Sequence, residues 1–248
     1  ATISWWTEYQ TYLKGIKSDA MTVGEAYTAN SIVGNYFSGG SGFDQAFNFD
    51  FQSGLVNSLK QSSATSIRNV ITGKPANVPW RFFAPFIENH DIGRLITAIG
   101  QDFRRAKLGA AVLLTFPGTP YIYYGSEIGM INGTKSGDLA YRTPMVWDNS
   151  TGGGFSTGTS WNAISGTADP ANISYQNSDT NSLLQLYKKL IALRKSQNGL
   201  RRGSMYLIDN TSAGSTLCYL RPGTSESILL IANFSGITST IVLNFSNS

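Results

Sequence analysis

Along roughly the first 200 positions, stretches with helical spacing of apolar residues alternate with short strand-like runs. The helical spacing predicts helices over residues 3–17, 52–72, 102–114 and 181–197. Asn181 and Ser182 are candidate N-cap residues of the last helix, and Gly199 is its candidate C-cap. Apolar or alternating runs predict strands over residues 20–25, 43–51, 80–91 and 121–125, the last of them buried. Strands that alternate with helices indicate parallel β-α-β units.

The pattern changes after Gly203. Four short strand-like runs, separated by turn residues, cover residues 204–210, 215–223, 227–235 and 239–246. Runs spaced about ten residues apart are typical of an all-β sandwich or barrel. We therefore expect a domain boundary near residues 200–204.

Two of the predicted parallel strands end in carboxylates, Glu25 and Asp91. In an eight-stranded α/β barrel, the catalytic groups lie at the C-terminal ends of the strands. Asp91 also follows His90, the single histidine of the chain. About four strand units precede Gly203, so either another half of the barrel lies N-terminal to this sequence or the domain is an open sheet.

Composition limits the other possibilities. The net charge is +4, but the basic residues form only short pairs beside apolar runs, which favours solvated helix faces over a nucleic-acid partner. The single cysteine, Cys218, excludes an intrachain disulfide, and its strand-like setting predicts a buried side chain. No run of about 18 apolar residues is present, so we expect no membrane span.

Six segments carry a family resemblance. In chain order they are VGEAY (23–27), FDQAFNF (43–49), FIENHD (86–91), LLTFPGTPYIYYGSEIGM (113–130), RTPMVWDNSTGGGFS (142–156) and LYKKLIALRK (186–195). Together they resemble the α-amylase family, glycoside hydrolase family 13. The resemblance implies an α/β fold in which residues 1–202 are the second half of a TIM (β/α)8 barrel, from the fifth strand to the eighth helix. Residues 203–248 would then be a small, truncated C-terminal β-sandwich domain.

The resemblance also implies roles for individual residues. Glu25 matches the family's catalytic general acid/base, and Asp91 matches the catalytic carboxylate that binds the sugar and stabilises the transition state. His90 matches the histidine that binds a sugar hydroxyl in the −1 subsite. The family's nucleophile is an aspartate in a GFRxDAA-like motif, which this sequence lacks, so the missing N-terminal half of the same protein is an expected partner. Structural calcium is common in the family, but no ligands for it are identifiable here.

Two further residues are candidates for binding substrate. Tyr27 lies near the end of its strand and could stack on a sugar face. Arg94 follows the FIENHD segment and is open to two interpretations, a contact with substrate or a salt bridge to a neighbouring carboxylate.

The resemblance favours an α-amylase that cleaves α-1,4 bonds of starch and maltooligosaccharides by a double displacement. GEAY is similar to amylases, whereas RTPMVWD resembles oligosaccharide-active members, so an α-glucosidase, an oligo-1,6-glucosidase or a transglycosylase stays open. An alternative from another class is a non-catalytic amylase-like domain, although such proteins tend to lose the residues that this chain keeps. Low charge and many small polar residues suit a secreted enzyme.

Overall fold

The central element is a parallel sheet of three short strands. A computed structural model describes residues 2–37, 42–166 and 170–245. Strands β1 (Val23–Gly24), β2 (Gln45–Asn48) and β3 (Phe83–Pro85) lie in the order β1-β2-β3. Val23 pairs with Gln45, and Ala46 pairs with Phe83. Because all three strands are parallel, the segments that follow them leave the sheet at the same end, where the strands have their C-termini.

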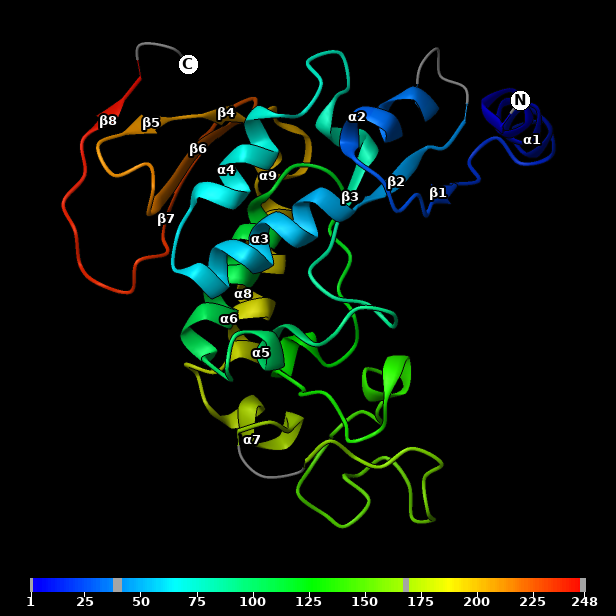
Figure 1. The fold of residues 1–248 in the computed structure, drawn as a ribbon, viewed down its shortest axis with the longest axis vertical. Helices are drawn as coiled ribbons and strands as arrows, with labels where there is room; N and C mark the ends of the chain where they lie inside the picture. Colours follow the sequence, from blue (N-terminus) through cyan, green and yellow to red (C-terminus); the bar gives the residue numbers. More distant parts are fainter. Residues whose placement is uncertain (1, 38–41, 167–169, 246–248) are drawn as a thin grey trace.

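Helices lie beside this sheet and extend away from it (Figure 1). The α-helices of the described residues are α1 (Thr2–Ile16), α2 (Asn30–Val33), α3 (Phe49–Gln61), α4 (Thr65–Thr72), α5 (Leu95–Ala98), α6 (Phe103–Thr115), α7 (Ile173–Ser178), α8 (Leu183–Ser196) and α9 (Asn198–Arg202). Short 3-10 turns span Gly34–Tyr36, Trp80–Phe82, Ser126–Ile128 and Gly137–Ala140. Helices α3, α6 and α8 pack together in the middle of the molecule, while α1 lies at one end.

The predictions for the helices over 3–17, 102–114 and 181–197 are confirmed, because their signals are local. Asp102 caps α6 by accepting hydrogen bonds from the backbone N–H groups of Arg104 (2.9 Å) and Arg105 (3.3 Å). Ser182 caps α8 by accepting from Gln185 N–H at 3.2 Å. The prediction for Gly199 is wrong, since it lies inside α9 instead of capping α8. A Cβ at this position would lie 2.5 Å from the carbonyl oxygen of Arg221, so the glycine permits close packing.

The predicted helix over 52–72 is two helices. Asn48 caps α3 by accepting from Phe51 N–H at 2.9 Å, so this helix begins earlier than expected. Ser62 ends α3 in the left-handed region, at φ 54°. A second amphipathic helix, α4, follows, with Ile67 and Ile71 buried.

The parallel strands are shorter than predicted, and residues 121–125 do not form a buried strand. This segment lies beside β3, where the N–H groups of Thr119 and Tyr121 donate to Phe83 O (3.2 Å) and Pro85 O (2.8 Å). Pro120 has no N–H to add to the ladder, and Ile122 and Tyr124 are each 39% exposed. The prediction of burial is wrong because no described element covers the outward side chains.

The last part of the chain forms two small antiparallel sheets. Their strands are β4 (Tyr206–Leu207), β5 (Asp209–Asn210), β6 (Thr216–Pro222), β7 (Ser227–Asn233) and β8 (Leu243–Asn244). One sheet has the order β4-β6-β7, and the other pairs β5 with β8. Cys218 in β6 is buried, as predicted. The predicted run 239–246 ends at a position outside the described residues.

The main hydrophobic core joins the helices to these strands. Phe51 and Leu55 of α3, Leu113 of α6 and Tyr219 of β6 belong to one buried cluster. The Tyr219 hydroxyl lies 2.7 Å from Thr115 Oγ1, which satisfies both buried groups. The β part therefore packs directly on α6. In the part of the chain that the structure describes, every helix is too short or too polar to cross a membrane.

Candidate active site

The two carboxylates predicted at strand ends follow strands of the same sheet. Glu25 comes directly after β1, and Asp91 belongs to the loop that leaves β3. Strand β2 lies between them, and neighbouring strands are about 4.8 Å apart, so the ends of β1 and β3 lie about 10 Å apart. Glu25 and Asp91 therefore both follow the C-terminal end of the sheet, although they are more than 60 residues apart in the sequence.

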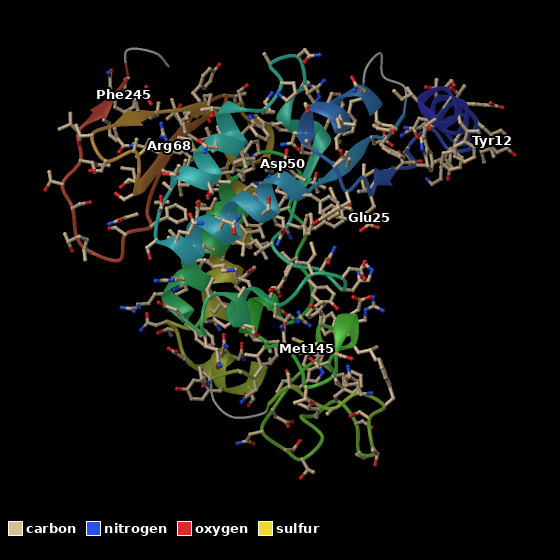
Figure 2. All side chains as sticks on the ribbon, viewed as in Figure 1. Tyr12, Glu25, Asp50, Arg68, Met145 and Phe245 are labelled. Carbon is tan, nitrogen blue, oxygen red and sulfur yellow. The ribbon has the colours of Figure 1, made fainter. Side chains whose placement is uncertain are left out.

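Glu25 is exposed and borders a groove of about 660 Å³ beside β1 (Figure 2). The wall of this groove is largely aromatic. Trp6 of α1 packs on Phe43 with ring centroids 4.8 Å apart, and Tyr36 stacks on the same ring at 5.8 Å. Helix α1 is anchored here by Asp44, which lies 3.0 Å from Lys14 Nζ and accepts a hydrogen bond from Gln10.

Tyr27 presents its ring to solvent. Its side chain is 82% exposed, and its ring forms a T-shaped pair with Phe49, at a centroid distance of 4.6 Å. A ring that is mostly exposed is accessible to a ligand. The predicted role in binding substrate stays a prediction.

His90 and Asp91 lie at the rim of the site, where an arginine holds them. Arg142 donates to Asp91 Oδ1 at 2.6 Å and, through Nε, to the His90 carbonyl at 3.0 Å. The same guanidinium pairs with Asp138 at 3.1 Å. His90 Nε2 lies 3.1 Å from the other oxygen of Asp91. Both side chains are about half exposed, so solvent or a sugar can reach them.

Beneath this rim is a buried ion pair. Arg94 and Glu88 have almost no exposed surface, and Arg94 NH1 lies 3.3 Å from Glu88 Oε1. Glu88 also accepts hydrogen bonds from Leu95 N–H and from Ser126 Oγ, the latter at 2.5 Å. The predicted contact of Arg94 with substrate is therefore not supported, because its guanidinium is fully enclosed by protein. The salt-bridge alternative describes this structure.

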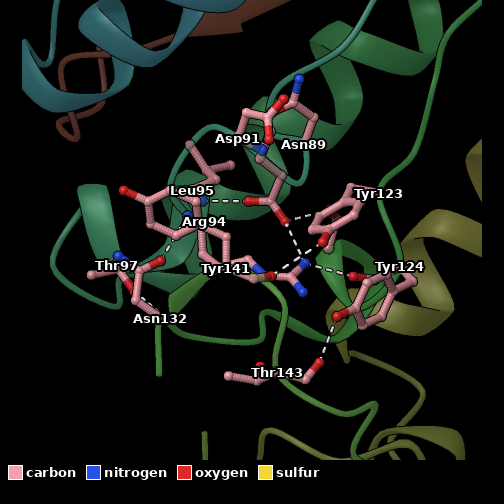
Figure 3. A network of polar contacts seen from close by, with 12 residues as sticks. Asn89, Asp91, Arg94, Leu95, Thr97, Tyr123, Tyr124, Asn132, Tyr141 and Thr143 are labelled. Carbon is pink, nitrogen blue, oxygen red and sulfur yellow. Dashed lines mark hydrogen bonds and ion pairs between the residues drawn. The ribbon is translucent and has the colours of Figure 1, made fainter. Parts of the chain in front are cut away.

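The buried arginine organises the surrounding loops (Figure 3). Its NH1 also donates to the Tyr124 carbonyl at 2.5 Å, and its guanidinium carbon lies 4.3 Å from the ring centroid of Tyr123. The two tyrosine hydroxyls then donate to backbone carbonyls on either side of Arg142, at Tyr141 (3.2 Å) and Thr143 (2.5 Å). A chain of contacts thus runs from the buried pair to the loop that carries Arg142.

Sequence reasoning missed three residues of this site. Arg142 begins the RTPMVWD segment, but its partner Asp91 lies 51 positions earlier. Glu88 directly precedes Asn89, His90 and Asp91, a position that could have marked it as part of the same loop. Glu127 is a mostly buried carboxyl whose pKa is raised by burial, and its Oε2 has no hydrogen-bond partner among the described residues.

The described residues offer no obvious place for a metal ion. No three His, Cys, Asp or Glu side chains in residues 2–37, 42–166 and 170–245 are arranged so that they could hold one. The calcium implied by the resemblance therefore has no assigned ligands here, and no chemistry of this site is derived from it.

Comparison with known proteins gives a consistent result. The family model for the α-amylase catalytic domain matches residues 1–203. The chain is 30% identical to alpha-amylase 3 of Dictyoglomus thermophilum, across 99% of this chain and 48% of that protein. It is 29% identical to a probable oligo-1,6-glucosidase of Bacillus subtilis, across 88% of this chain and 47% of that protein. A solved alpha-amylase from H. orenii superposes with a TM-score of 0.75 at 26% identity, covering 94% of this chain and 47% of that one. The chain spans about half the length of these relatives.

Proposed function

Because the chain belongs to the α-amylase family, glycoside hydrolase family 13, we propose that it is part of a retaining glycoside hydrolase acting on α-1,4-glucosidic bonds of starch and maltooligosaccharides. Its fold is a fragment of an α-amylase-type TIM barrel. The observation that carries the proposal is the position of Glu25 and Asp91 after two parallel strands of one sheet. In barrels of this kind, the catalytic groups lie at the C-terminal ends of the strands.

The proposed location within the barrel is its second half, residues 1–202, with residues 203–248 forming a C-terminal β-sandwich domain. Among the described residues, β1 pairs only with β2 and is an edge strand. An unpaired edge beside an aromatic groove of about 660 Å³ is suited to receive another strand. We propose that the preceding barrel strand of the N-terminal half occupies this groove and brings the nucleophilic aspartate next to Glu25.

The roles follow from the chemistry of retaining glycosidases. The nucleophile supplied by the other half attacks the anomeric carbon while Glu25 gives its proton to the departing glucosidic oxygen, so one C–O bond forms as another breaks. Glu25 then removes a proton from water, which attacks the same carbon and releases the aspartate. Asp91, which pairs with Arg142, stabilises the positive charge that develops on the sugar. His90 binds a sugar hydroxyl, and Tyr27 stacks on an adjacent sugar.

A second candidate is cleavage of α-1,6 bonds or transfer of glucosyl groups. The similarity to a probable oligo-1,6-glucosidase is nearly as high as that to an alpha-amylase. Arg142, from the segment that resembles oligosaccharide-active members, also lies at the rim beside Asp91. Rates on maltotriose and on isomaltose, measured side by side, distinguish the two bond types. A non-catalytic role is disfavoured because Glu25 and Asp91 are both present. Secretion stays a prediction.

The direct test uses the whole enzyme and three isosteric substitutions. Glu25→Gln and Asp91→Asn should each lower kcat on maltoheptaose by about 100-fold or more, since each removes a group that acts in the transition state. Glu8→Gln is the matched control, because Glu8 is exposed on α1 and outside the site. Near-normal turnover by Glu25→Gln, with its fold intact by circular dichroism, would exclude the acid/base role.

A further inference from the structure

A second pocket lies at the N-terminal ends of the parallel strands, at the end of the sheet opposite to Glu25 and Asp91. It has a volume of about 510 Å³. One wall is lined by Gln45, the first residue of β2, and by the turn Trp80–Phe82 that precedes β3. Its other wall is the connection from α9 to β4. Glu25 and Asp91 follow the C-terminal ends of the strands, so this pocket is separate from the candidate active site.

The lining of this pocket is strongly cationic. Lys74, Arg81, Arg201 and Arg202 line it, and none of them forms an ion pair with a carboxylate within the described residues. Arg81 lies over the ring of Phe82 at 4.6 Å, and the side chains of Arg201 and Arg202 make no hydrogen bond in that part of the chain. Four positively charged residues thus line one concavity, and three of them, the arginines, are exposed to solvent.

The acidic group in the lining does not offset these charges. Asp44 is the carboxylate found among the lining residues, and its oxygens accept hydrogen bonds from Gln10 and Thr22 and pair with Lys14 of α1 at 3.0 Å. Its charge is therefore already compensated by groups outside the pocket.

Two further guanidinium groups, one buried and one half-buried, add to the positive field. Arg221 is 1% exposed, lines the pocket, and donates to the carbonyl oxygens of Ser204 (2.9 Å), Leu200 (3.0 Å) and Gly203 (3.0 Å). Arg194 likewise donates to carbonyls, at Leu114 (2.9 Å) and Phe116 (2.8 Å). Neither has a carboxylate partner in the described chain. Burial lowers the pKa of Arg221 to about 10, and the nearby charge of Arg194 also acts to lower it.

Clustered cations without a counter-charge repel one another, and the buried Arg221 has no anionic partner among the described residues, so an anion bound among these groups offsets an electrostatic cost. We propose that this pocket binds a phosphate monoester, such as a sugar phosphate. Arginine forks match the geometry of phosphate oxygens, and Lys74 has one N–H left after donating to Pro75 O and Val78 O. The volume is that of a small-molecule site, whereas a nucleic acid would require an extended basic stripe. This inference does not depend on the glycosidase proposal.

The test is calorimetric titration of the whole protein, in low-salt buffer free of phosphate, with inorganic phosphate, glucose 6-phosphate and glucose. We expect saturable binding of glucose 6-phosphate with a Kd of about 1 mM or tighter, weaker binding of phosphate, and no response to glucose at this site. The double variant Arg201→Ala/Arg202→Ala should raise the Kd for glucose 6-phosphate at least about tenfold. Hydrolysis of maltoheptaose by this variant should be unchanged.

The matched control is Lys60→Ala/Lys195→Ala. It removes the same number of exposed positive charges from side chains that lie outside the pocket and make no hydrogen bond or ion pair among the described residues. The control should bind as the unaltered protein does. The proposal is overturned by no saturable heat with glucose 6-phosphate, by unchanged binding in Arg201→Ala/Arg202→Ala, or by equal weakening in both double variants, which would mark non-specific attraction.

Discussion

The buried pair of Arg94 and Glu88 gives a prediction that separates a structural role from a substrate contact. Replacing Arg94 with methionine keeps much of its apolar stem but leaves Glu88 without its counter-ion in a site where it is 4% exposed. Removing one partner of a buried ion pair typically costs about 3–5 kcal/mol. Arg94 also donates to the Tyr124 carbonyl and lies over the Tyr123 ring. We therefore expect a loss toward the upper end of that range.

The second substitution, Glu88→Gln, removes the charge but keeps an oxygen that can accept from Leu95 N–H and Ser126 Oγ. It leaves the buried guanidinium without an anion, so it should also destabilise the protein by about 3 kcal/mol. The double variant lacks both charges of this pair. Since neutral replacements of buried pairs are often tolerated, its loss should fall below the sum of the single losses by about 2 kcal/mol.

The assay is urea unfolding of the whole enzyme, followed by tryptophan fluorescence, for the four members of this cycle. The kcat/KM on maltoheptaose is measured at a temperature where each variant is still folded. Two results would refute the structural role. One is strict additivity of the losses in unfolding free energy. The other is an Arg94→Met variant of normal stability with a raised KM, which would indicate that Arg94 contacts the substrate.

Two further predictions concern neighbouring groups. Burial raises the pKa of Glu127, so the folded state binds its proton more tightly than the unfolded state does. The associated stability is present below the ordinary pKa and is lost as pH rises through the folded value, so the stability of Glu127→Gln relative to the unaltered protein should increase as pH rises above the ordinary carboxyl pKa. A difference that does not change with pH would contradict this. Arg142→Met should lower kcat about 10- to 100-fold by freeing the turn at His90 and Asp91, with a stability change of about 1 kcal/mol or less. Partial rescue by Arg142→Lys is expected, and equal activity of all three proteins would contradict the positioning role.

The helices α1, α6 and α8 could be predicted from the sequence because their determinants lie within a few residues of one another. Asp102 and Ser182 cap α6 and α8 through bonds to residues two or three positions later. The exposure of the segment 121–125 could not be predicted in this way. Its exposure depends on whether another element covers it, and that is decided by residues far away in the chain.

The same difference applies to the site. The positions of Glu25 and Asp91 follow from a rule about strand ends, so they could be chosen from the sequence. The partner of Asp91 could not, because Arg142 is 51 residues away and belongs to a loop without regular secondary structure. For Arg94 the sequence left two roles open, and only its burial decides between them.

These contacts explain how an exposed rim can still be held in place. Exposed ion pairs such as Asp91–Arg142 contribute little stability, so they would not fix His90 and Asp91 unless Arg142 were itself held. The buried layer supplies this constraint. Arg94 holds the backbone at Tyr124, and the hydroxyls of Tyr123 and Tyr124 hold the carbonyls of Tyr141 and Thr143, which flank Arg142. A site that must stay open to the proposed sugar substrate can therefore keep its geometry, because the groups that fix it are buried one layer below.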